Sequence, residues 1–279
     1  MIEADRQPGI FARDLGSMLQ KIRELTGLSY DEAAARLACE ADWLVRVETG
    51  FATVTSEEVA RILVEYGARE ASVADSMIDL ARRAAAPPPW LAPHTSRMTA
   101  EARDILLIEA EATLAHVHGY RVIPLLVQTE DYFREIAPGL YRDCDVDQEW
   151  DLLSHRQAHQ PGGVTRLLEV IIDECAFELK LKRPEAMTGQ LRHLLSLADT
   201  PHVTIRVVPM HAPIAEHRLY NFDILSFAGT ADRIGISYTA LGTYFAHSDA
   251  YGIWEDIKDR FAVDPAPSRT ILEQRLAAS

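Results

Sequence analysis

Apolar residues recur with helical spacing near the start of the chain. One stripe of side chains at i, i+3, i+4 and i+7 spacing consists of Leu15, Met18, Leu19, Ile22 and Leu25. Gly27 follows this stripe, and glycine commonly stands just after the last turn of a helix because it adopts the left-handed conformation without strain. The pattern predicts an amphipathic helix that buries one face and ends before Gly27.

Two polar quartets mark the starts of further helices. Ser29 with Glu32, and Thr55 with Glu58, have the spacing of a capping box, in which each side chain accepts a hydrogen bond from the backbone of the other residue. A third short helix lies between these two and ends at Gly50. The inward positions predicted for the three helices are Ala33, Ala34, Leu37, Leu44, Val47, Val59, Ile62, Leu63 and Tyr66.

The helical pattern stops at a run of prolines. A fifth helix is predicted from Val73 to about Ala85, and the stretch "AAAPPPW" follows it. Three consecutive prolines do not fit inside a helix and favour an extended spacer. We therefore expect a mainly α N-terminal helix-turn-helix bundle over residues 1–86 and a second domain over residues 87–279.

The second domain mixes two periodicities. Helices are predicted at 99–120, 147–159, 184–199 and 250–261, with a short one from Ser268. Strands rich in β-branched and aromatic residues, bounded by Pro, Gly or Asp, are predicted at 166–174, 202–209, 220–227 and 232–240. The pattern indicates an α+β domain with a small sheet of three to five strands.

The first four helices contain a recognisable frame. The stretch "LQKIRELTGLSYDEAAARLACEADWLVRVETG" combines Arg23, "GLS", a pair of alanines where two helices approach, and the "VETG" ending. It resembles the XRE (lambda-repressor-like) helix-turn-helix family. The resemblance implies that Glu48 pairs with Arg23 and holds the third helix against the first.

The surface that this family uses to contact DNA is unusual here. The candidate DNA-binding residues are Tyr30, Glu40, Asp42, Trp43 and Arg46, and only Arg46 is a strong donor. A carboxylate accepts a hydrogen bond from cytosine N4, but two carboxylates beside phosphates are costly. Two interpretations stay open at this stage, a surface that selects a DNA site and an inherited scaffold that no longer binds DNA tightly.

The net charge of the chain does not favour DNA binding. The chain carries 28 Lys and Arg against 42 Asp and Glu, a net charge of -14. Residues 1–85 alone contain 15 acidic and 10 basic residues, so their net charge is 10 − 15 = −5. Any contact with DNA therefore requires a local basic patch. The basic residues expected to support one are Arg13, Lys21, Arg23, Arg36 and Arg61.

Cysteine usage and hydropathy favour a soluble cytoplasmic protein. Cys39, Cys144 and Cys175 are far apart and form no C-x-x-C spacing, which indicates free thiols rather than a disulfide framework or a zinc site. The N-terminus lacks a signal-peptide pattern. No apolar run approaches the roughly 20 residues of a membrane span.

Stretches in the second domain extend the resemblance. "HGYRVIPLLVQTEDYFR" is similar to the signature Y-x-x-x-x-P-G-L-L-Q-T-x-x-Y-A, with Leu125 in place of the glycine after Pro124. The stretches that follow in the family's order are "RQAHQ", "VIIDECAFEL", "MTGQLRHLL", "TPHVTIRVVP" and "YNFDILSF". The chain thus resembles the actinobacterial group of XRE regulators with a C-terminal sensor-like domain, antitoxin-like and akin to WhiJ-type developmental regulators. The resemblance implies control of transcription, modulated by a small partner protein.

One loop of the second domain departs from this pattern. In "HAPIAEHRLYNF", a histidine and an arginine stand where the family usually has glycines, which alters a loop able to approach a ligand. The stretch "GISYTALGTYFAHS" also lacks the acidic residue that usually follows the strand in this family. The candidate ligand-binding residues in this loop are His211, His217, Arg218 and Tyr220. The competing interpretation is a solvated loop.

Signals for catalysis and metal binding are weak. His155 and His159, spaced i, i+4, and the pair His116 and His118 lack a clear third ligand. The adjacent carboxylates in "IIDE" are more typical of a strand end than of an acid/base pair. No G-x-S-x-G, G-x-G-x-x-G or P-loop is present. We expect no catalytic residue, no metal and no cofactor.

Three hypotheses follow from these patterns. The first is a transcriptional regulator that binds operator DNA as a homodimer and is modulated by a small molecule or a small partner protein. The second is a repurposed regulator with a degraded DNA face, whose C-terminal pocket binds or transforms a small molecule, as a secondary-metabolism enzyme does. The third is an antitoxin-like protein-interaction module.

Overall fold

The computed structural model describes residues 8–68, 70–85, 90–140, 145–159, 165–228, 233–239, 242–246 and 250–279 of the 279-residue chain. The chain divides into two compact units, residues 1–108 and 109–279. The domain boundary predicted between residues 86 and 87 falls in 86–89, outside the described residues. No helix in the described ranges is both long enough and apolar enough to cross a bilayer.

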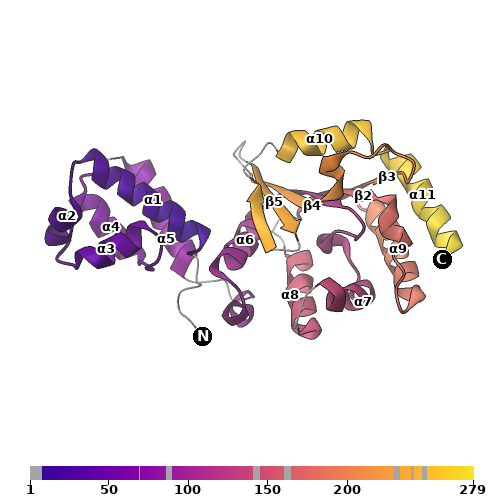
Figure 1. Ribbon diagram of the computed structural model, residues 1–279, viewed down its shortest axis with the longest axis horizontal. Coiled ribbons are helices and arrows are strands. Elements are labelled where there is room, and N and C mark those ends of the chain that lie inside the picture. The colour runs from indigo at the N-terminus through magenta and orange to yellow at the C-terminus, as the bar shows by residue number, and fades with distance from the viewer. Residues whose placement is uncertain are drawn as a thin grey trace. The chain divides into compact units, whose positions relative to one another are not determined.

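The first unit is a bundle of helices, as the apolar stripes predict (Figure 1, indigo to purple). Its first five helices are α1 (Ile10–Leu25), α2 (Tyr30–Leu37), α3 (Ala41–Glu48), α4 (Ser56–Glu65) and α5 (Ala71–Ala85). The 3₁₀ helix η2 (Ala92–Arg97) and helix α6 (Ala100–Glu111) follow. The first four helices and α5 share one core, whose fully buried members are Leu19, Ala33, Leu44, Val59, Ile62, Met77 and Ala81.

Local sequence sets the starts of two helices in this unit. The Ser29 side chain accepts from the Glu32 backbone, and the Glu32 carboxylate accepts from the Ser29 N–H at 2.9 Å. Thr55 and Glu58 form the same reciprocal pair. Both predicted capping boxes are confirmed. They satisfy backbone N–H groups that a helix start otherwise leaves without partners.

The second unit is built on a sheet with the strand order β3-β2-β1-β4-β5-β6. The strands are β1 (Leu114–Gly119), β2 (Leu167–Asp173), β3 (Val203–Val208), β4 (Asn221–Ser226), β5 (Arg233–Thr239) and β6 (Gly242–Ala246). Strands β1, β2 and β3 are parallel, whereas β4, β5 and β6 continue the sheet antiparallel. The α+β prediction is confirmed, with six strands among the described residues rather than three to five.

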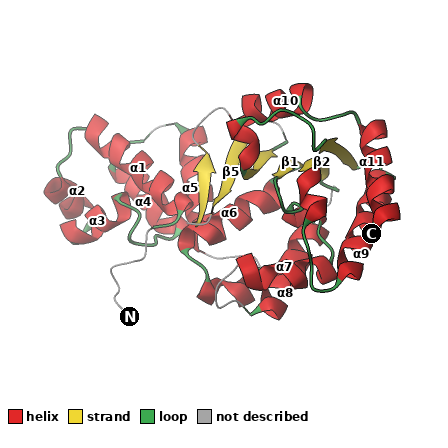
Figure 2. Ribbon diagram, turned by 45° about the vertical axis from the view of Figure 1, so that its right-hand side comes forward, coloured by secondary structure: helices red, strands yellow, loops and turns green. Residues whose placement is uncertain are grey.

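Helices cover both faces of this sheet (Figures 1 and 2). On one face, Trp254 and Ile257 of α10 (Ala250–Arg260) pack with Ile171 of β2 and Ile224 of β4. Figure 1 shows the other helices on the opposite side of the sheet or beside β3, and α11 packs against both α9 and β3. These helices are α7 (Glu130–Leu140), α8 (Val146–Ala158), α9 (Pro184–Ala198) and α11 (Pro265–Ala278). The short 3₁₀ helices of this unit are η3 (Leu125–Val127), η5 (Glu174–Glu178) and η6 (Glu216–Leu219).

The helix predicted over residues 99–120 is wrong in its second half. Helix α6 ends at Glu111, and residues 114–119 form β1, a central strand of the sheet. His116 and His118 point to the face that α10 covers and are only 4% and 1% exposed. Strand β1 is short and follows soon after α6, and its alternating residues, Ala115 and Val117 against His116 and His118, are buried on both faces, so the histidines do not mark a solvent-facing side.

The free side of β3 is covered by the segment that leads into α11. The Val207 N–H donates to Ser268 Oγ at 2.8 Å, and the Val207 carbonyl accepts from the Val263 N–H at 2.9 Å. Ser268 is fully buried. Helix α11 begins at Pro265, before the predicted start, because proline is well suited to the first turn of a helix.

Candidate functional site

Helix α3, the second helix of the helix-turn-helix, is fixed by a buried ion pair. Arg23 of α1 donates from Nε and Nη2 to the two carboxylate oxygens of Glu48 at 2.9 and 2.8 Å. The Arg23 and Glu48 side chains are 7% and 0% exposed. The pairing implied by the family resemblance is confirmed. Close backbone packing adds to it, because a Cβ on Gly16 of α1 would lie 2.5 Å from the Glu48 carbonyl oxygen.

Two tyrosines complete this network. The Tyr66 hydroxyl donates to Glu48 Oε1 at 2.9 Å, and the Arg23 guanidinium lies 3.8 Å from the centroid of the Tyr30 ring. The hydrogen bond with Glu48 raises the pKa of Arg23, and burial raises the pKa of Tyr66. Arg23 therefore stays protonated and Tyr66 stays neutral at neutral pH, and their contacts with Glu48 hold α3 in one orientation.

The five candidate DNA-binding residues separate into two groups. Glu40, Asp42 and Arg46 are exposed, and their side chains make no hydrogen bond or ion pair within the described part of the chain. Tyr30 and Trp43 are partly buried and pack against the core of the bundle. The solvent-facing surface of α3 therefore includes three charged side chains that no hydrogen bond or ion pair from the described residues occupies. We call Glu40, Asp42 and Arg46 the α3 face.

The basic residues expected to support this face do not all remain available. Arg23 is committed to Glu48 and cannot contact phosphate. Arg36 donates to the Glu65 carbonyl at 3.4 Å, a long hydrogen bond that leaves the guanidinium exposed. Lys21 and Arg61 are exposed. Inclusion of Arg23 among the phosphate-binding candidates is therefore wrong.

In the second unit, a groove of about 670 Å³ lies between the loop after β3 and helix α11. His211, one of the four candidate ligand residues, lines it together with Glu174, Thr270 and Gln274. The volume is within the range of small-molecule sites. Tyr220 is 49% exposed and its carbonyl forms a hydrogen bond with His118 at 2.8 Å.

The other two candidates in this loop lie differently. Arg218 points inward, where its Nη2 donates to Asp173 Oδ2 at 2.7 Å and its Nη1 donates to the Pro213 carbonyl. Both side chains of this ion pair are almost fully buried. The side chain of His217 is outside the described part of the structure. The guanidinium of Arg218 thus ties the loop to the end of β2.

The adjacent carboxylates of "IIDE" are both paired with arginine. Asp173 holds Arg218, whereas Glu174 accepts from Arg275 Nε at 2.9 Å and from the Met210 N–H at 2.7 Å. These contacts connect the end of β2 to α11 and to the loop after β3. The arrangement is that of a structural junction, in agreement with the interpretation as the polar end of a strand.

Family models match both parts of the chain. A model described as a helix-turn-helix domain matches residues 14–75, which include most of α1, all of α2 to α4 and the start of α5. A model described as a domain of unknown function, DUF5753, matches residues 102–274, more than half of the chain. The chain belongs to the DUF5753 family. It has no significant match among curated proteins or among solved structures.

The DUF5753 domain contains a buried charged cluster that local sequence patterns did not reveal. Glu109 is 1% exposed and accepts from Nη2 and Nε of Arg156 at 2.6 and 3.1 Å. Arg166 Nη1 lies 3.6 Å from the same carboxylate, and its Nε donates to the Ala112 carbonyl at 3.1 Å. Burial alone raises the pKa of Glu109, but the Arg156 charge and hydrogen bonds outweigh this and hold the pKa below its usual value. Arg156 lies in "RQAHQ", which is the only sequence signal pointing to the cluster.

Asp223 of β4 belongs to the same DUF5753 interior. The Tyr238 hydroxyl donates to Asp223 Oδ2 at 2.7 Å, and Asp223 is 6% exposed. Burial raises the pKa of Asp223 to about 7, although the hydrogen bond from Tyr238 opposes the shift. The carboxyl group therefore titrates near neutral pH inside the folded protein.

We expect Asp223→Asn to make the protein relatively more stable as pH rises. The unfolded carboxyl ionises near pH 4 but the folded one only near pH 7, so wild type loses up to about 1.4 kcal/mol of unfolding free energy per pH unit across that window. The uncharged amide avoids this loss. Urea unfolding at pH 5, 6, 7 and 8 measures the difference in stability between the variant and wild type. The control is Asp259→Asn, at an exposed position. Parallel stability profiles for wild type and Asp223→Asn would contradict the buried titration.

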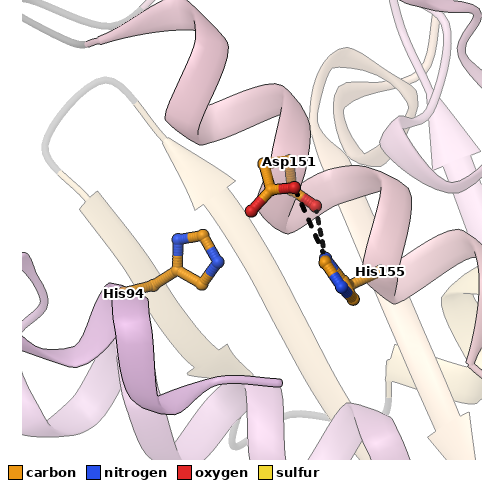
Figure 3. Close-up of side chains that lie close together, drawn as sticks. All are labelled: His94, Asp151 and His155. Atoms are coloured by element: carbon orange, nitrogen blue, oxygen red, sulfur yellow. Dashed lines mark hydrogen bonds and ion pairs between the residues drawn. The ribbon is translucent and has the colours of Figure 1, made fainter. Parts of the chain in front are cut away.

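The histidine pairs of the DUF5753 domain occupy different environments. His155 is exposed on α8, where Nδ1 lies 2.8 Å from the Asp151 carbonyl oxygen and 3.9 Å from its carboxylate (Figure 3). His116 is buried, and its ring lies edge-on to the Trp254 ring with 5.1 Å between the ring centroids. Its Nε2 atom lies 3.5 Å from Oε2 of Glu169. Burial lowers the pKa of His116, so its neutral form is favoured.

Proposed function

We propose that this protein is a transcriptional regulator of the XRE (lambda-repressor-like) type that binds operator DNA through α3. One observation carries the proposal. Among the described residues, the three charged side chains of the α3 face have no hydrogen-bond or ion-pair partner, and the buried Arg23–Glu48 pair holds their helix in place. The match to a helix-turn-helix domain over residues 14–75 supports DNA as the ligand. In this motif the second helix enters the major groove.

The DUF5753 domain is proposed to dimerise the protein and to receive a signal. Helix-turn-helix proteins commonly bind two half-sites about one helical turn apart, which requires two copies. The groove beside His211 and Glu174 is a candidate site for a small molecule. The resemblance to antitoxin-like, WhiJ-type actinobacterial regulators favours a small partner protein as the alternative signal.

Arg46→Ala is expected to weaken operator binding at least about fivefold. Arginine contacts guanine O6 and N7 with two hydrogen bonds, and loss of one such pair costs roughly 1–3 kcal/mol. Fluorescence polarisation against the DNA upstream of the gene, at low and physiological salt, measures the change. Because a base contact releases no phosphate counterion, the dependence of affinity on salt should stay similar in the mutant.

The matched control for this titration is Arg82→Ala. Arg82 lies on α5 with 75% of its side chain exposed, and its removal changes the net charge by the same amount. Equal losses for the two variants would mean that only bulk charge matters. Absence of binding even at low salt would favour the competing hypothesis, a regulator whose DNA face has degraded.

A further inference from the structure

The α3 face contains an acidic residue that the proposed function does not explain. Asp42 is the second residue of α3, and Arg46 follows one turn later on the same side of the helix. Leu44, Val47 and Glu48 occupy the opposite, buried side. In docked helix-turn-helix proteins, the N-terminal residues of this helix contact base edges. Asp42 therefore occupies a position that meets bases, yet a carboxylate there is repelled by the phosphates on either side.

A structural role for Asp42 accounts for little. An acidic residue in the first turn interacts favourably with the helix dipole, which contributes roughly 0.3–1 kcal/mol at exposed sites. Asp42 makes no capping hydrogen bond, since the N-cap position of α3 is Glu40 and shows no side-chain cap. Asp42 is also free of any ion pair with Arg46 in the described structure. Its carboxylate remains available to a ligand.

Hydrogen-bond chemistry limits which base this carboxylate accepts. An ionised carboxylate only accepts, so the acceptor atoms of guanine (O6, N7) and thymine (O4) repel it. Cytosine N4 and adenine N6 are the donors in the major groove. Adenine places its N7 acceptor beside N6, where it faces the second carboxylate oxygen, whereas cytosine offers no acceptor there. Cytosine is thus the base that a carboxylate at this position selects.

We propose that Asp42 is a specificity-determining residue that requires a cytosine in each operator half-site, with Arg46 contacting a guanine nearby. This inference rests on the proposed function of DNA binding through α3. Four residues of helix rise about 6 Å, and base pairs are 3.4 Å apart, so the two bases lie roughly two base pairs apart. Asp42 lowers affinity for every other sequence and thereby trades strength of binding for selectivity.

Selection from a pool of random-sequence DNA duplexes tests the inference without knowledge of the operator. Full-length wild type, Asp42→Asn and the control Glu57→Gln are each used to select bound DNA, which is then sequenced; Glu57 is an exposed acidic residue in the first turn of α4, outside the α3 face. Wild type is expected to select one cytosine in every half-site. Asp42→Asn is expected to select adenine instead of cytosine at that position, since asparagine pairs with adenine N6 and N7. The rest of the selected sequence should stay the same. Glu57→Gln should leave the preference for cytosine unchanged.

Affinities for single duplexes make the result quantitative. Replacing the selected C·G pair by T·A should weaken wild-type binding at least about fivefold, the lower end of the cost of one mismatch. For Asp42→Asn, the adenine duplex should bind more tightly than the cytosine duplex. A thermal melt of each variant checks folding. If Asp42→Asn does not fold, Asp42→Ser takes its place and should lose the preference for cytosine.

The outcomes separate this inference from the proposed function. An unchanged cytosine preference in both Asp42 variants overturns the inference while leaving DNA binding intact, and it assigns Asp42 to the helix dipole. If wild type selects no sequence, because it binds all duplexes equally or binds none, both the proposed function and the inference are overturned. A switch confined to one position per half-site supports both.

Discussion

Replacing Glu48 with alanine is expected to lower the unfolding free energy of the first unit by about 3–5 kcal/mol. The change leaves the Arg23 guanidinium buried without its anion and removes the acceptor of the Tyr66 hydroxyl. Each change leaves a buried polar group without a partner, which lowers the free energy of unfolding. Hydrogen exchange of backbone amides in α1 to α4 reports the stability of this unit separately from the other.

The control for Glu48→Ala is Glu40→Ala, which removes an exposed carboxylate from the same helix-turn-helix and should change stability by less than about 0.5 kcal/mol. Replacing both partners, as in Arg23→Met with Glu48→Leu, should restore much of the loss, since apolar side chains can fill the space of a buried ion pair. A Glu48→Ala effect no larger than the control effect would show that the pair does not hold α3.

Glu109→Ala is expected to destabilise the second unit by an amount at least as large, about 3–5 kcal/mol. Glu109 faces two arginines, and its removal leaves Arg156 and Arg166 buried side by side without their carboxylate. Like charges in a medium of low polarity repel strongly. Hydrogen exchange of β1, β2 and β4 measures the effect.

A second substitution distinguishes repulsion from loss of packing. Adding Arg156→Met to Glu109→Ala removes one of the two unpaired cations and should recover part of the lost stability. The control is Glu111→Ala, an exposed residue near the end of the same helix. If the double variant is less stable than Glu109→Ala, packing rather than charge dominates the cluster, contrary to the prediction.

The helical bundle was predictable because its signals are local. Apolar stripes and the two capping boxes lie within single helices, and the structure shows them where the sequence places them. The helical phase also correctly exposes Asp42 and Arg46. It could not show that Tyr30 packs inward, because that follows from the guanidinium of Arg23, a residue on another helix.

The second unit depends on contacts between distant residues. Strand β1 was missed because it is short, follows soon after α6, and buries His116 and His118 on a covered face of the sheet, where polar residues are not expected. The pairing of Glu109 with Arg156 spans 47 residues, and that of Arg218 with Asp173 spans 45. Charge in a sequence does not tell whether a side chain meets solvent, a ligand or an opposite charge inside the fold.

The covered side of β3 limits how this protein can associate. A free strand edge is a template on which another chain adds a strand, in specific dimers and in aggregates alike. At Val207, both the N–H and the carbonyl are already bonded to Ser268 and Val263 of the same chain, and α11 packs alongside. Another chain therefore cannot add a strand to β3 at Val207 without displacing Ser268 and Val263.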